Sequence, residues 1–121
     1  MKLSVSQIVN SVPVLNKLKD EQLPVKLSYR VGRILEKFAK EYNLFEDTRL
    51  SLVKKYGVEN TDGNFEVAED KRSQFFKDLS DVLQEEVELS IPLIPLEMFP
   101  NSSLITPQDM VYISFLIEEP M

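Results

Sequence analysis

Residues 58–69 come closest in this chain to a metal site by residue type and spacing. A twelve-residue calcium loop takes oxygen ligands at its first, third, fifth and twelfth positions and a glycine at its sixth. The stretch VENTDGNFEVAE has Gly63 at the sixth position but Val58, which carries no side-chain oxygen, at the first. The oxygen-bearing candidates in this loop are Asn60, Asp62, Asn64 and Glu69.

The same stretch also fits a β-hairpin. Asp62-Gly63 lies between two short runs of strand-forming residues, which is typical of a tight hairpin turn. In a hairpin Val58 is a strand residue that pairs across the turn with the returning strand around Phe65 and Val67. Since this interpretation explains Val58, we predict a structural hairpin over residues 58–67 with no metal and no cofactor. The calcium loop is the weaker alternative.

The chain lacks several of the side chains that enzymes use most often in catalysis. It contains no Cys and no His, which excludes disulfides, thiolate nucleophiles and imidazole bases and leaves carboxylate, lysine or tyrosine chemistry. Glu85, Glu86 and Glu88 could form a metal cluster or an acid/base pair, but an acidic helix end beside a strand is more typical of a solvated face. We therefore predict that the protein is not an enzyme.

A local basic strip stands out in this acidic chain, whose net charge is −6 at pH 7. The strip lacks interleaved aromatic side chains, and the net charge opposes phosphate binding, so we expect no direct nucleic-acid binding. Surface salt bridges or an acidic protein partner are the expected roles. The strip consists of Lys17, Lys19, Lys26, Arg30 and Arg33.

The elements that must position these residues are mainly helical. Within residues 24–56, Val31, Phe38, Phe45 and Leu52 recur every seven residues, which predicts one amphipathic helix about 45 Å long that Gly57 caps. Such a helix is too long for a small local core. We predict that it forms an antiparallel helical hairpin with a second helix over residues 70–86.

Shorter elements flank this hairpin. Residues 6–20 have helical spacing interrupted by Pro13, which predicts either a kinked helix or two pieces with Ser11 capping the second. Residues 87–94 alternate as a strand, with Pro92 confining it to an edge or a strand end. Thr106 caps a final helix that reaches about residue 117. The predicted fold is α+β but mainly α, with a small antiparallel β element, in a single domain over residues 1–121.

Residues 91–121 carry more apolar side chains than a short strand and one helix can bury. Part of this region is expected at an interface between copies or with a partner; the equal alternative is that it closes the core. The residues predicted for the interface are Leu96, Phe99, Met110, Val111, Ile113 and Phe115.

Several motifs are shared with a known group of proteins. They are F-E-x-x-R at residues 45–49, K-Y-G at 55–57, the D-G-N turn at 62–64, E-V-E-L at 86–89 and the proline-capped helix start ITPQDM at 105–110. With the leucine-proline helix start, this pattern resembles a group of small uncharacterised bacteriophage proteins. The resemblance covers most of the chain and implies a phage origin, but it implies no activity.

We therefore expect a non-enzymatic bacteriophage protein that acts by protein-protein association, as a minor virion component or an assembly factor. Its expected partners are other phage proteins or itself. The sequence has neither a signal peptide pattern nor a run of about 20 apolar residues, so we expect a soluble protein in the host cytoplasm that is not membrane-bound. The alternative is a small acidic inhibitor of a host enzyme; a calcium-binding or carboxylate-dependent enzyme is the least favoured.

Overall fold

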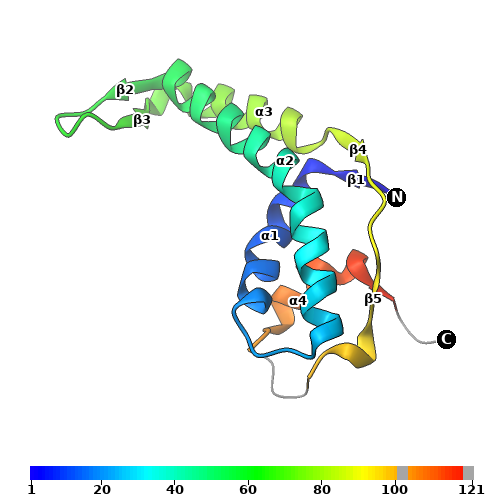
Figure 1. The fold of residues 1–121 in the computed structure, drawn as a ribbon. Helices are drawn as coiled ribbons and strands as arrows, with labels where there is room; N and C mark the ends of the chain where they lie inside the picture. The colour runs from blue at the N-terminus through cyan, green and yellow to red at the C-terminus, as the bar shows by residue number, and fades with distance from the viewer. Residues whose placement is uncertain (101–103, 119–121) are drawn as a thin grey trace.

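The computed structural model describes residues 1–100 and 104–118, and its fold is α+β and mainly α, as predicted (Figure 1). Four α-helices carry most of the described chain: α1 (Val5–Lys19), α2 (Val25–Tyr56), α3 (Arg72–Leu83) and α4 (Pro107–Ile113). The strands are short: β1 (Lys2–Ser4), β2 (Gly57–Glu59), β3 (Phe65–Val67), β4 (Glu86–Glu88), β5 (Ile94–Pro95) and β6 (Ile117–Glu118).

Helix α1 is continuous from Val5 to Lys19 although Pro13 lies inside it. Its first turn is fixed by a capping box, in which Ser4 and Gln7 satisfy each other's backbone N–H groups. Ser11 is fully buried and its hydroxyl donates to the carbonyl oxygen of Ile8, so it does not cap a second piece. Of the two alternatives, a kinked helix or two pieces, the one with two pieces is therefore wrong.

The main core lies between α1 and the first half of α2. Residues of α4 and β5 cover this core from the other side. Phe38 is its largest fully buried side chain. The α1–α2 pair is an antiparallel hairpin joined by a short loop, so α2 has a partner in α1 that the sequence pattern did not indicate (Figure 1). The other core residues are Leu3, Ile8, Val12, Val14, Leu15, Leu18, Leu27, Val31, Ile34, Ile94, Ile113 and Leu116.

The second half of α2 leaves this core and forms an arm with the hairpin and α3. We define the arm as residues 44–83 and the rest of the described chain as the body. Figure 1 shows the arm extending away from the body, with α3 running back along α2. The predicted helical hairpin between α2 and α3 is confirmed. The hydroxyl of Tyr56 donates to Asp78, which joins the end of α2 to α3 and lowers the pKa of Asp78.

Gly57 follows α2 but does not adopt the left-handed conformation of a capping glycine, since its φ is −98° and its ψ is 164°. It is instead the first residue of β2. A Cβ atom at this position would lie 2.2 Å from the carbonyl oxygen of Val53, which is far inside contact distance. Glycine is required here because the strand turns back closely on the last turn of the helix.

The predicted strand over residues 87–94 is divided into two. Strand β4 pairs antiparallel with β1, and β5 pairs in parallel with β6, while Pro92 lies in the extended segment between them. Side chains of α2 support this segment: Arg30 donates to the carbonyl oxygen of Leu93 and Lys37 to that of Ser90. The segment therefore lies along α2 without belonging to a larger sheet.

The final helix is also shorter than predicted. Thr106 caps α4 as expected, but α4 ends at Ile113 and is followed by a 3₁₀ turn (Ser114–Leu116) and then β6. This change of direction places Ile113 and Leu116 together in the core.

Candidate functional site

The predicted hairpin at residues 58–67 is confirmed. Strands β2 and β3 are antiparallel, with Val58 opposite Glu66 and Glu59 opposite Phe65. The turn needs Gly63, whose φ is +82°. The side-chain oxygen of Asn60 accepts the backbone N–H groups of Asp62 and Asn64 at 2.9 and 3.1 Å. This oxygen, one of the calcium candidates, thus stabilises the turn itself.

The remaining calcium candidates are exposed. Asp62 and Asn64 lie in the turn, whereas Glu69 begins the 3₁₀ turn that leads into α3. In the part of the chain that the structure describes, no group of three or more Asp, Glu, His or Cys side chains is arranged to hold a metal ion. The geometry of this stretch is that of a hairpin turn.

Negative charge is concentrated around the hairpin. Residues 57–70 contain five carboxylates and no Lys or Arg, whereas residues 1–56 contain eleven Lys and Arg against six Asp and Glu. We call residues 57–67 the tip. It is the end of the arm farthest from the body, and it presents exposed Val58 and Phe65 among its carboxylates (Figure 1).

A groove lies at the opposite end of α2. It has a volume of about 770 Å³ and is formed where the first turns of α2 meet the extended segment before β5. Its apolar surface comes from Val25, Tyr29, Pro92 and Leu93. Val25 and Tyr29 are 86% and 65% exposed, so they are open to a partner.

Three cations of the predicted basic strip line this α2 groove. Lys26 and Arg33 form no ion pair with any described residue, and Arg33 lies over the ring of Tyr29 at 5.8 Å. Arg30 is partly buried and holds Leu93 by its hydrogen bond. Glu118 contributes the one carboxylate among the described lining residues, so the groove carries a net positive charge.

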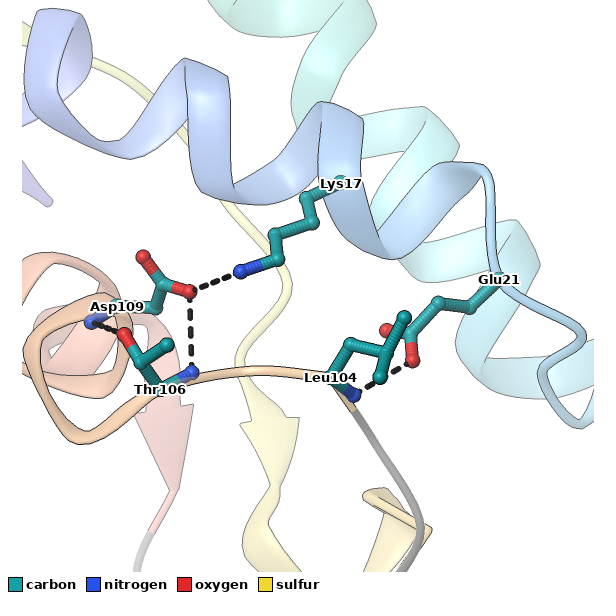
Figure 2. Close-up of polar contacts among 5 residues, drawn as sticks. All are labelled: Lys17, Glu21, Leu104, Thr106 and Asp109. Atoms are coloured by element: carbon teal, nitrogen blue, oxygen red, sulfur yellow. Dashed lines mark hydrogen bonds and ion pairs between the residues drawn. The ribbon is translucent and has the colours of Figure 1, made fainter.

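The other two members of the strip lie elsewhere. Lys19 is exposed near the end of α1, away from the α2 groove. Lys17 pairs with Asp109 at 2.8 Å, as Figure 2 shows. Asp109 also accepts the backbone N–H of Thr106, and these contacts, first the one from Lys17, hold the pKa of Asp109 below its usual value. This pair and the hydrogen bond from the Leu104 N–H to Glu21 attach the start of α4 to α1 and to the loop that follows α1 (Figure 2).

The residues predicted for an interface have different environments. Ile113 is fully buried in the chain's own core, and Phe99, Met110 and Phe115 are partly buried against it. Leu96 and Val111 are 41% and 64% exposed. Within the predicted interface region, residues 101–103 and 119–121 lie outside the described residues. For Ile113, the structure replaces the interface prediction with a core position.

The carboxylates Glu85, Glu86 and Glu88 are all exposed. Glu86 lies 3.5 Å from Lys2, and Glu88 accepts the N-terminal ammonium at 2.8 Å. That hydrogen bond lowers the pKa of Glu88. A carboxylate with a lowered pKa is a poor proton donor near neutral pH, so Glu88 is not suited to act as a general acid.

The chain was compared with protein-family models, with characterised proteins and with solved structures, and none of them matches it. The resemblance to small bacteriophage proteins therefore stays a prediction. Among residues 1–100 and 104–118, no helix combines the length and the apolar character needed to cross a membrane.

Sequence reasoning did not find the α2 groove. The sequence shows the basic residues of the groove, but their positions alone predicted a single basic strip that included Lys17 and Lys19. The signal that was available is the spacing of Val25, Tyr29 and Arg33, which recur every four residues and so share one face of a helix. Residues 92–93 could not be assigned to this site, because they lie 59 to 68 positions after Arg33 and Val25 in the chain.

Proposed function

We propose that this chain is a non-enzymatic bacteriophage protein that works by protein-protein association, as a minor virion component or an assembly factor in the host cytoplasm. Its partners are other phage proteins or further copies of itself. The phage assignment is supported by the sequence resemblance. The association is supported by one structural observation, the arm.

The arm has almost no core of its own. Among residues 44–83, all of which the structure describes, only Phe45 and Phe75 are buried. Val58, Phe65 and Phe76 are 64%, 40% and 61% exposed on the same arm. A two-helix arm that leaves so many large apolar side chains in water is typical of a docking element rather than of a self-sufficient unit.

Two measurements test this proposal. Light scattering on the purified protein is expected to show a mass that rises with concentration, and mass spectrometry of purified virions is expected to detect the chain or a partner that co-purifies with it. A strict monomer that is absent from virions and associates with no phage protein would overturn the proposal.

A variant links the association to the arm. Replacing Val58, Phe65 and Phe76 with Ser removes exposed apolar surface and is expected to weaken association while the circular dichroism spectrum stays helical. The matched control replaces the exposed polar residues Thr61 and Ser73 with Ala, which changes the same elements without removing apolar surface. Equal association in both variants would show that the arm is not the docking element.

A second function is favoured by the acidic tip. The tip carries three carboxylates and no Lys or Arg, and it lies on an arm that extends from the body, so it could occupy the cationic nucleic-acid groove of a host enzyme. Affinity purification from host lysate separates the two functions. Recovery and inhibition of a host polymerase or nuclease supports the inhibitor, whereas capsid or tail proteins support the structural role.

A further inference from the structure

We propose that the tip of one copy docks into the α2 groove of a second copy, so that copies associate head to tail. This inference rests on the proposed function of association and names its partner as another copy of the same chain. It is carried by three observations: the chemistry of the groove, the chemistry of the tip and the distance between them.

The groove is lined by both apolar and cationic side chains. Tyr29 and Leu93 supply apolar lining, while Lys26 and Arg33 have no carboxylate partner among the described residues. A volume of about 770 Å³ lies within the range of roughly 300–1,000 Å³ that is typical of ligand pockets. The groove therefore has room for several side chains of a narrow inserted element.

The tip offers the complementary pattern. Residues directly opposite in an antiparallel pair share one face of the ribbon, so Val58 lies beside Glu66 on one face and Phe65 beside Glu59 on the other. Each face thus presents one apolar side chain and one carboxylate, and all four are exposed. Whichever face enters the groove, an apolar group can meet Tyr29 or Leu93 while a carboxylate meets Lys26 or Arg33.

A chain cannot make this contact with itself. The groove is built on the first turns of α2, whereas the tip follows its last residue, Tyr56. From Tyr29 to Tyr56 the helix spans about 40 Å at 1.5 Å per residue, and Figure 1 shows the tip pointing away from the body. Complementary surfaces at opposite ends of one helix must therefore meet between different copies.

The resulting contact is heterologous, because the tip and the groove are different surfaces. An open assembly of this kind keeps a free groove at one end and a free tip at the other until a ring closes, so the contact generates rings or open chains rather than an isolated symmetric dimer. Because the attraction depends on exposed charges, it should weaken when salt is added.

Charge reversal tests the contact on the full-length protein. The groove variant carries Lys26→Glu and Arg33→Glu, and Arg30 is kept because it holds Leu93. The tip variant carries Glu59→Lys and Glu66→Lys. Sedimentation velocity at low salt is expected to show concentration-dependent association of the wild type and at least about tenfold weaker association of each variant alone.

The decisive sample is an equimolar mixture of the two variants. Its reversed tips are cationic and its reversed grooves anionic, so each variant's tip complements the other variant's groove, and association is expected to return. A charge-matched control, Lys19→Glu with Lys40→Glu, changes exposed lysines outside the groove and should associate like the wild type. Misfolding cannot produce recovery on mixing.

Other results overturn the proposal. If both reversed variants associate as strongly as the wild type, or if the mixture does not recover, the contact is not tip to groove, although association through another surface would leave the proposed function intact. A wild type that stays monomeric but binds a synthetic Glu- and Phe-containing peptide through Lys26 and Arg33 would assign the groove to a different protein. If the tip variant, with Glu59→Lys and Glu66→Lys, loses its helical circular dichroism spectrum, the milder variant Glu59→Gln with Glu66→Gln is measured in its place. This milder variant must also weaken association.

Discussion

Replacing Phe75 with alanine is expected to release α3 from α2 without unfolding the body. Phe75 is 8% exposed and is the only buried residue of α3, a helix of 12 residues. An isolated helix of this length is marginal in water, so α3 depends on its tertiary contacts, of which Phe75 is the buried apolar one and the Tyr56–Asp78 hydrogen bond a polar one. The body core, in contrast, contains neither Phe75 nor Phe45.

The size of the effect follows from the burial of this ring. Phe-to-Ala changes in buried positions cost about 3–5 kcal/mol, and every 1.4 kcal/mol changes an equilibrium about tenfold. The opening of the arm should therefore become at least about 100-fold more favourable. Amide hydrogen exchange in residues 72–83 should accelerate by that factor, while exchange in α1 changes by no more than about twofold because α1 belongs to the body.

The adjacent Phe76 provides the matched control. It is 61% exposed, and its ring makes an edge-to-face contact with Phe75 at 5.3 Å, which is worth about 0.5–1.5 kcal/mol. Phe76→Ala should accelerate exchange in α3 by about tenfold at most. The reasoning fails if Phe76→Ala matches Phe75→Ala, or if Phe75→Ala accelerates exchange equally in α1 and α3.

Three further predictions concern the tip and the start of α4. Gly57→Ala places a Cβ atom 2.2 Å from the carbonyl oxygen of Val53 in α2 and should destabilise the hairpin. Amide hydrogen exchange in residues 57–67 should be at least about fivefold faster than in the wild type, and an unchanged exchange rate would refute the close approach. The hydrogen bond from Lys17 is the main cause that lowers the pKa of Asp109 in the folded protein. The ionised Asp109 carboxylate therefore stabilises the fold at pH values above its pKa in the unfolded chain, near 4, and this stabilisation is lost as the pH falls through the lower pKa of the folded state. The free energy of unfolding of the wild type, measured in urea, should therefore fall below about pH 4. The Asp109→Asn variant should be less stable than the wild type at pH 7, and its free energy of unfolding should depend less on pH below about pH 4. Equal pH dependence of the two proteins would contradict this. Met110→Asp should lower the free energy of unfolding by about 2 kcal/mol or more, because Met110 packs on the core. Val111 is 64% exposed, so Val111→Asp should keep the wild-type melting temperature. Equal losses of stability in the two variants would place both residues in the core.

Some of this architecture follows from short stretches of sequence. The seven-residue recurrence of apolar residues that includes Val31 and Phe38 predicts α2, because a helix repeats its faces nearly every seven residues. Asp62-Gly63 predicts the hairpin, since its turn geometry needs a positive φ at Gly63. Thr106 predicts the start of α4 through its cap. All three signals depend on contacts within a few residues.

The sequence by itself thus determined which segments are helices and where the hairpin turns, along with the acidic charge of the tip. Only the tertiary structure decided that α1 is the main partner of α2, that Ile113 is a core residue and that Leu93 joins Tyr29 in one groove. Apolar periodicity shows that a face must be covered but not which segment covers it. That choice depends on packing between segments far apart in the chain, and no local pattern encodes it.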